Sequence, residues 1–394
     1  MSKHAPQSIL IVGGGVFGIT ASIELKARGW QVSVIDQGPV PHPDAASTDI
    51  SKVIRMDYGA DEIYTAMGEA AIRGWLRWNA QWDTPLFHQD GFLMMTRDRE
   101  MQPGSFERES FDFLTRRGHG LRRVGAADLR KSHPAWDSTV YRDGYLNPSG
   151  GWAESRRVIA KLAGLASSCG VMIHEGAAFA SFVDNGTRIT GVRDAIGRPW
   201  PADLVLVAAG AWTPFLLPHL RAVMKITGQP VVHLQPENVD EFRPPAFPVW
   251  AADIGRTGWY GFPANAEGIV KVANHGPGRE IVEPGQLREV TVAEVDRFMD
   301  FLRGTFPQLA TARIAATRQC WYCDTFDGHF WIDHERPGLL VAAGDSGHAF
   351  KFAPVLGGLI ADVVEGTPNA WAHRFRARTK GGDGADGARA NLQA

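Results

Sequence analysis

A glycine-rich turn lies near the N-terminus of this chain, between two short apolar segments, and it limits the folds that the chain can adopt. Residues 8–12 read SILIV and are followed by GGGVFG, in which Gly13, Gly15 and Gly18 have the spacing G-x-G-x-x-G. The sequence after the turn is typical of a helix, and it leads to a second apolar segment, QVSVID, that ends at Asp36. These residues predict a strand, a helix and a second strand, about the size of one βαβ unit.

Each glycine of this turn has a physical task in binding a diphosphate. The first permits a tight turn, the second lets the backbone approach a pyrophosphate, and the third lets the helix pack closely on the strand. The free N–H groups at the start of the helix face the diphosphate, so Val16 and Phe17 belong to the expected site. Asp36, followed by Gln37, is placed to accept hydrogen bonds from ribose hydroxyls. The motif predicts an ADP-containing cofactor and leaves NAD and FAD open.

Buried segments typical of parallel strands recur in three separated places, at residues 8–36, near 171–210 and at 339–343. We therefore expect the α/β class, with a Rossmann-like nucleotide-binding domain built from discontinuous segments and a β-rich α+β cap domain for the substrate. The nucleotide-binding domain is expected at residues 1–85, 150–220 and 320–370. The cap is expected at residues 86–149 and 221–319. The polar, glycine-rich tail at 380–394 is expected to be disordered.

Composition narrows the setting of the protein. The formal net charge of −2 makes neither nucleic acid nor an anionic membrane an expected partner. No apolar run approaches the roughly 20 residues that cross a bilayer, and the N-terminus shows no signal segment. Three cysteines are too few for a secreted disulfide scaffold. We expect a cytoplasmic protein without a metal site.

Two of the three cysteines, Cys320 and Cys323, lie close together in the segment RQCWYC. Zinc binding, redox exchange, simple burial and covalent attachment of a cofactor are all conceivable roles. Zinc would need two more ligands, and the chain has no second cysteine pair. A redox pair of the thioredoxin kind should begin a helix, and this segment opens none. Burial and attachment of a cofactor remain.

Three further segments carry a family resemblance. They are AASTDISKVIRMDYG, WYGFPANAEGIVKVANH and CWYCDTFDGHFWIDHERPGLLVAAGDSGHAFKF. With the glycine turn, they resemble the FAD-dependent amine oxidases, the branch of the D-amino-acid-oxidase superfamily that contains monomeric sarcosine, fructosyl-amino-acid, pipecolate and saccharopine oxidases. The resemblance runs from about residue 8 to 366. It implies FAD as the cofactor and a glutathione-reductase-type fold for the FAD-binding domain.

The resemblance also implies which residues contact the flavin. Cys320 matches the cysteine that is bonded through sulfur to the flavin ring, and Cys323 is then expected to be a small buried apolar residue. The turn Gly210–Trp212 matches one that packs near the cofactor. The remaining matched positions are Ser47, Thr48, Lys52, Gly210, Trp212, Gly344, Ser346, Gly347, His348 and Lys351.

Catalytic roles follow from the same resemblance. Lys271 matches a lysine that helps O₂ accept its first electron, because a fixed cation favours an anion forming beside it. Strand alternation alone would also allow the Lys271 ammonium to lie in solvent. Arg55 and Lys351 match the two cations that hold the substrate carboxylate. Tyr260 and His275 are expected beside them.

These residues predict a flavoprotein oxidase, a monomer that converts a secondary amino acid to an imine and reduces O₂ to hydrogen peroxide. The imine then hydrolyses. Alternatives are a dehydrogenase or demethylase that uses another acceptor, an NAD-dependent dehydrogenase, and a non-catalytic flavin-binding subunit. Sarcosine oxidase proper has a basic residue at the position of Thr48, whereas the pattern here, Asp49-x-x-Lys52, is closer to the fructosyl-amino-acid and saccharopine oxidases. We therefore expect a larger substituent on nitrogen.

Overall fold

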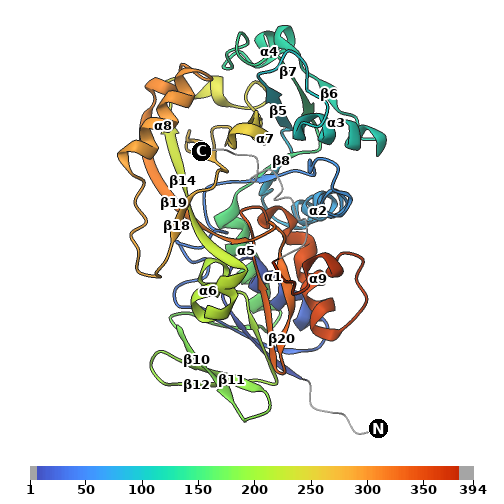
Figure 1. The fold of residues 1–394 in the computed structure, drawn as a ribbon, viewed down its shortest axis with the longest axis vertical. Coiled ribbons are helices and arrows are strands. Elements are labelled where there is room, and N and C mark those ends of the chain that lie inside the picture. Colours follow the sequence, from blue (N-terminus) through green and yellow to red (C-terminus); the bar gives the residue numbers. More distant parts are fainter. Residues whose placement is uncertain (1–6, 381–394) are drawn as a thin grey trace.

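The computed structural model describes residues 7–380. A six-stranded sheet forms the core of its lower half, as drawn in Figure 1. All neighbouring strands are parallel except the edge strand β20, which is antiparallel to β21. In spatial order the strands are β20 (Trp331–Arg336), β21 (Leu339–Ala343), β13 (Leu204–Val207), β1 (Ser8–Val12), β2 (Gln31–Ile35) and β9 (Met172–His174). The expected α/β class, with one sheet built from three separated segments, is confirmed.

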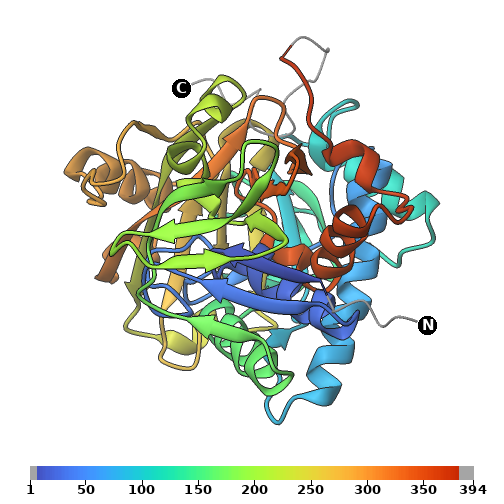
Figure 2. The same cartoon turned by 90° about the horizontal axis from the view of Figure 1, so that it is seen from below.

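Four helices accompany this sheet, and α1 packs against both α9 and α5. Seen from below, α9 lies beside the N-terminal part of the chain, where it packs on α1 although the two helices are far apart in sequence (Figure 2). The helix α2 begins after Asp61, whose carboxylate accepts a hydrogen bond from Tyr64 N at 2.9 Å and so caps the helix. Their bounds are α1 (Val16–Ala27), α2 (Glu62–Gln81), α5 (Ser155–Ser168) and α9 (Ala353–Glu365).

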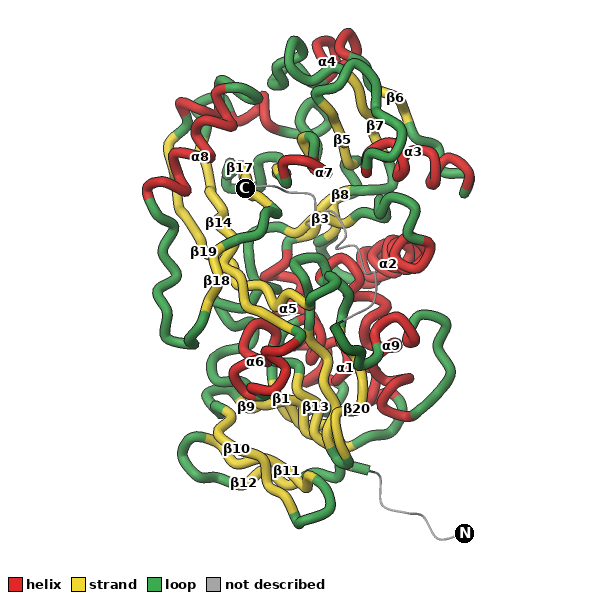
Figure 3. Tube along the Cα trace, viewed as in Figure 1, coloured by secondary structure: helices red, strands yellow, loops and turns green. Residues whose placement is uncertain are grey.

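A nine-stranded sheet extends above the first one (Figure 3). Its strands run in the order β18 (Arg279–Ile281), β14 (Met224–Gln235), β17 (Val270–Asn274), β16 (Trp259–Phe262), β15 (Val249–Ala252), β5 (Phe92–Thr96), β7 (Asp143–Asn147) and β6 (Arg122–Arg123). The long strand β19 (Arg313–Thr325) pairs with β14 along its whole length and contains both Cys320 and Cys323. The cysteine segment is therefore a strand, which agrees with the expectation that it begins no helix.

Smaller elements complete the chain. Two three-stranded sheets consist of β10 (Phe179–Asp184), β11 (Ile189–Asp194) and β12 (Pro199–Pro201), and of β3 (Lys52–Ile54), β8 (Gly151–Ala153) and β4 (Phe87–His88). The other α-helices are α3 (Phe106–Arg116), α4 (Ala126–Ser132), α6 (Thr213–Leu216), α7 (Ile254–Thr257) and α8 (Val292–Arg303). Short 3-10 turns lie at Gly210–Trp212, Pro218–Ala222, Val239–Phe242, Leu309–Thr311, Phe350–Phe352 and Ala372–Phe375.

Residues 7–380 were searched for helices that could cross a membrane and for clusters of metal-binding side chains. None of the helices in this range is both long and apolar enough to pass through a bilayer. No three His, Cys, Asp or Glu side chains in the range gather as a metal site would require. The tail expected to be disordered lies outside the described residues, apart from its first residue.

Candidate active site

The glycine-rich turn joins β1 to α1 in a space that only glycine fits. Gly13 has φ of +110°, and a Cβ there would lie 2.5 Å from the carbonyl oxygen of Ala208 beside β13. A Cβ on Gly18 would lie 1.9 Å from the carbonyl oxygen of Gly13. Helix and strand are therefore as close as the sequence motif requires, and the N-terminus of α1 is directed to the carboxyl end of the sheet.

Asp36 follows β2 and braces the turn. Its carboxylate accepts hydrogen bonds from Gly14 N at 2.8 Å and from Gly38 N at 3.1 Å. Burial raises the pKa of Asp36, although these N–H groups oppose the shift. The side chain keeps lone pairs toward the cavity that it lines, where ribose hydroxyls could donate to them.

A cavity opens at the carboxyl ends of β1, β2 and β13. The crevice at this end of parallel strands is the usual place for a nucleotide. Ser47 Oγ accepts a hydrogen bond from Val16 N at 3.0 Å beside it. The predicted cofactor-contacting residues that line the cavity are Gly13, Gly15, Val16, Phe17, Asp36, Gln37, Ser47, Lys52, Gly210, Trp212 and Gly347. The glycine turn, the carboxylate and the apolar walls together fit an FAD.

A second pocket adjoins the first, and the two share Lys52, Tyr322, Gly347 and Phe350. Several catalytic residues predicted from the sequence meet there, although they come from distant parts of the chain. The predicted residues in its wall are Lys52, Arg55, Tyr260, His275, Gly347, His348 and Lys351. This pocket is the candidate substrate site.

Arg55 enters the second pocket between aromatic rings. Its guanidinium carbon lies 4.7 Å from the ring centre of Tyr58 and 5.7 Å from those of Phe92 and Phe106. The buried Nη1 atom has no hydrogen-bond partner among residues 7–380. Because a buried donor without a partner is costly, this nitrogen is a candidate to bind an acceptor on a ligand.

Lys351 adds a second cation to the same pocket. It is only 4% exposed, and its Nζ donates to the carbonyl oxygen of His348 at 2.7 Å. Burial holds its pKa well below the usual value, and the positive charges of Arg55 and Lys52 add to the shift. In the described part of the chain, no carboxylate forms an ion pair with Arg55 or Lys351. A ligand carboxylate could therefore pair directly with both side chains.

Lys271 is buried, which excludes the solvent-exposed alternative. It is 1% exposed, and its Nζ lies 2.6 Å from Asp49 Oδ2 and donates to the carbonyl oxygen of Ser51 at 2.6 Å. Burial lowers the pKa of Lys271 to about 8, although the charge of Asp49 opposes the shift. Lys271 is not in the wall of either cavity, but Lys52, whose charge also acts on it, is in both.

Cys320 is 1% exposed, and its sulfur lies 3.9 Å from the Nζ of Lys52. Cys323 is fully buried, with its sulfur 3.8 Å from Met224 Sδ, as a small apolar residue would be. The two side chains therefore have different surroundings although both lie on β19.

The remaining predicted residues lie around these cavities in different ways. The hydroxyls of Tyr260 and Tyr322 are 3.4 Å apart, and His275 lies against the Tyr322 ring. The turn after β21 has left-handed backbone conformation at Gly344, Ser346 and Gly347. This conformation favours glycine, and two of the three residues are glycines. Gly18, Thr48, Gly344 and Ser346 are outside both cavity walls. Thr48 donates to the carbonyl oxygen of Ala45 at 3.0 Å.

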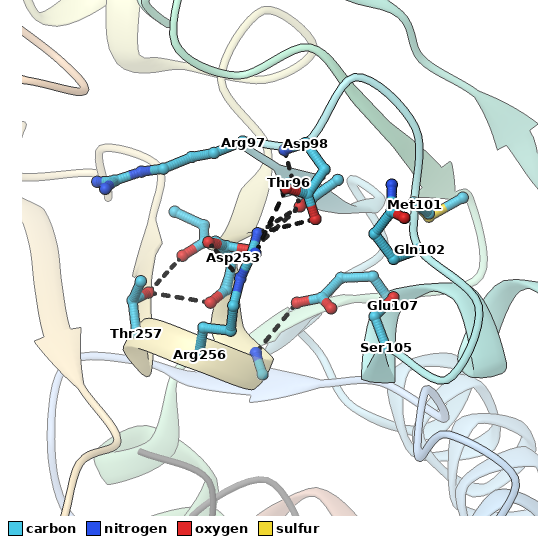
Figure 4. Close-up of polar contacts among 12 residues, drawn as sticks. Thr96, Arg97, Asp98, Met101, Gln102, Ser105, Glu107, Asp253, Arg256 and Thr257 are labelled. Atoms are coloured by element: carbon cyan, nitrogen blue, oxygen red, sulfur yellow. Dashed lines mark hydrogen bonds and ion pairs between the residues drawn. The ribbon is translucent and has the colours of Figure 1, made fainter. Parts of the chain in front are cut away.

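A larger cavity adjoins the second pocket and shares Arg55, His275 and His348 with it. Figure 4 shows one polar part of its wall. There the Nη2 of Arg256 lies 2.8 Å from Asp253 Oδ1 and 3.1 Å from Asp98 Oδ2, so its charge is already balanced. This outer cavity gives a long substituent on the substrate room to extend from the second pocket.

Sequence reasoning did not select several residues of this site. Asp49 appears only within the pattern Asp49-x-x-Lys52, and no motif of the sequence contains His233. His233 Nε2 lies 3.2 Å from Asp49 Oδ1. Tyr322 and Asp345 lie inside a segment that carried the family resemblance, which could have identified them. No sequence motif identifies His233, because its place beside Asp49 depends on the register between β14 and β17.

Comparison with known proteins agrees with this geometry. Residues 8–363 match the family described as FAD dependent oxidoreductase. The chain is 29% identical to the L-saccharopine oxidase of Schizosaccharomyces pombe over 93% of each chain. It is 23% identical to the monomeric sarcosine oxidase of Bacillus sp. over 92% of this chain and 93% of the relative. The crystal structure of fructosyl amine:oxygen oxidoreductase (Amadoriase I) from Aspergillus fumigatus has a TM-score of 0.80 and 26% identity, covering 94% of this chain and 89% of that one.

Proposed function

The chain belongs to the FAD dependent oxidoreductase family, and on this premise we propose that it is an oxidase of a secondary amino acid. The relatives named above are oxidases of saccharopine, sarcosine and fructosyl amines. This supports an oxidase more strongly than a dehydrogenase that passes electrons to another acceptor.

The observation that carries the proposal is that two basic side chains in the second pocket, Arg55 and Lys351, form no ion pair with a carboxylate of residues 7–380. Arg55 offers a buried Nη1 without a partner, and Lys351 is buried without an ion-pair partner in the described range. A carboxylate bound by both would relieve these costs and hold the neighbouring amine next to the cofactor cavity. Such a pocket fits an α-amino acid, and the outer cavity accommodates a long substituent on its nitrogen.

When bound, FAD supplies the two-electron oxidant, and the residues of the first cavity would hold it. The substrate loses two electrons and two protons from its C–N unit and becomes an imine, which water hydrolyses. O₂ takes up two electrons and two protons and becomes hydrogen peroxide. We propose that Lys271 assists this second half-reaction as a buried cation and that Cys320 bonds covalently to the flavin.

Substrate titration under anaerobic conditions tests the proposal. Sarcosine, pipecolate, saccharopine and a fructosyl amino acid would each be added to the holoenzyme while flavin absorbance is followed. We expect at least one to bleach the flavin, and the aerobic reaction to release one peroxide for each substrate consumed. Full turnover without peroxide would reject the oxidase, whereas a flavin that no secondary amino acid reduces would reject the amine-oxidising site.

A further inference from the structure

Lys271 is held by a buried carboxylate that neither the sequence motifs nor the proposed reaction assigned to a role. The Asp49 side chain is 2% exposed, and its Oδ2 lies 2.6 Å from Lys271 Nζ. Its other oxygen, Oδ1, lies 3.2 Å from Nε2 of His233 and accepts a hydrogen bond from Ile50 N at 2.7 Å. Both carboxylate oxygens are therefore engaged, one of them by Lys271.

The fold builds this arrangement from three sheet strands and a loop. Lys271 on β17 is directly paired with His233 on β14 and with Phe262 on β16, so the three side chains lie in a row on one face. The Lys271 ammonium lies 4.6 Å from the ring centre of Phe262. Asp49 precedes β3, and Ser155 at the start of α5 fixes its backbone: Ser155 Oγ donates to Asp49 O at 2.7 Å and accepts from Asp49 N at 3.1 Å.

The charge of the Asp49 carboxylate raises the pKa of Lys271. The titratable groups that act on Lys271 are Asp49, Lys52 and Cys320, and His233 and Tyr260 lie beside Asp49. Burial lowers the Lys271 pKa most, and the like charge of Lys52 lowers it further. Asp49 is the main group that opposes both. Without it, the uncompensated buried ammonium would lose its proton at a lower pH.

We propose that Asp49 is a positioning residue that keeps Lys271 protonated and fixed for the reduction of O₂, with His233 bracing its second oxygen. The inference rests on the proposed function, because it assumes that Lys271 assists electron transfer to O₂. In that step O₂ gains two electrons from the reduced cofactor and two protons, and Asp49 is not consumed.

The first test compares flavin reduction and reoxidation by rapid mixing in the wild type and in Asp49→Asn. We expect reduction to change less than about threefold and reoxidation at pH 7.5 to slow by about tenfold or more, since loss of one preorganised charge has effects of that size or larger. The fall in reoxidation rate with rising pH should move to lower pH in the variant, because its Lys271 loses the proton more readily. At the acid end the two rates should converge.

Asp194→Asn is a matched control, because Asp194 is a buried carboxylate that bonds to Trp200 Nε1 at 3.0 Å in the small sheet β10–β12. It should leave the pH profile of reoxidation unchanged. If Asp49→Asn does not fold, Asp49→Glu retains the charge and should reoxidise within about threefold of the wild type at pH 7.5. A Glu variant as slow as Lys271→Met would overturn the inference.

A second readout does not depend on turnover. Urea unfolding midpoints would be measured for Asp49→Asn, Lys271→Met and the double variant. Because removal of one partner leaves the other buried and unpaired, the midpoint loss in the double variant should be smaller than the sum of the two single losses. Additive losses would contradict the pairing.

The outcomes separate this inference from the proposed function. A wild type whose reduced flavin does not react with O₂ rejects the oxidase, and the unfolding cycle still decides whether Asp49 and Lys271 are coupled. A wild type that reoxidises rapidly, with an unchanged rate and pH profile in Asp49→Asn, rejects the role of Asp49 alone.

Discussion

The ammonium of Lys52 lies 3.9 Å from the sulfur of Cys320. Burial lowers the pKa of Lys52, but the electrostatic interactions with Cys320, Asp49 and Tyr260 outweigh it, so the net shift is upward. A basic side chain in the wall of the cofactor cavity therefore lies next to the sulfur that we propose to bond the flavin.

Cys320→Ser tests the covalent bond. Acid precipitation of the wild type should leave the yellow colour in the pellet, whereas Cys320→Ser should release its flavin into the supernatant. Cys323→Ser is the control, because that sulfur packs against Met224 and should not affect retention. A wild type that releases all of its flavin would show that no such bond exists.

Lys271→Met should slow reoxidation of the reduced flavin by about 10²-fold, because it removes the buried charge that we propose to assist the reduction of O₂. Flavin reduction should change by less than about threefold. In the wild type the reoxidation rate should fall as pH rises through about 8, since the ammonium is the active form. Stopped-flow absorbance measures the rates of both half-reactions, flavin reduction and flavin reoxidation. Lys161→Met, an exposed lysine paired with Asp83 on the surface, should behave like the wild type.

Arg55→Gln should raise KM for a carboxylate substrate by about 10- to 100-fold, the range expected for a lost charged hydrogen bond of about 1.5–3 kcal/mol. The rate of flavin reduction at saturation should fall less than KM rises. Steady-state kinetics and inhibition by simple carboxylates measure the effect. Arg117→Gln, whose partners Glu62 and Glu69 are on another surface, is the control. An unchanged KM would show that Arg55 does not bind the substrate carboxylate.

Gly18→Ala should destabilise the protein by about 1–3 kcal/mol and reduce its flavin content, because the new Cβ would lie 1.9 Å from the carbonyl oxygen of Gly13. Gly164→Ala is the matched change in helix α5, where nothing lies within 4 Å. It should stabilise the protein by about 0.5–1 kcal/mol. Urea unfolding and the ratio of flavin to protein absorbance check both variants. Equal effects would contradict close packing at Gly18.

Short sequence motifs were sufficient to predict the features that depend on residues close together in the sequence. The glycine spacing and the acid at Asp36 predicted the turn between β1 and α1. In the structure, Asp61 and Thr291 cap the N–H groups that follow them at the starts of α2 and α8. The long pairing of β14 with β19 was not predicted, because its partners are separated by a large part of the chain. The monomeric state and cytoplasmic location stay predictions.

Local motifs were enough to predict that a dinucleotide turn, a run of parallel strands and a set of cations and cysteines occur in an order typical of one flavin-dependent family. They could not show whether Lys271 faces water, because alternation along a strand places a side chain on one face without saying what covers that face. The folded chain answers that question. There the Asp49 loop covers the sheet, and the register of β14 with β17 places His233 beside the pair. Burial and long-range register depend on contacts between segments distant in sequence, so they appear only when the chain is folded.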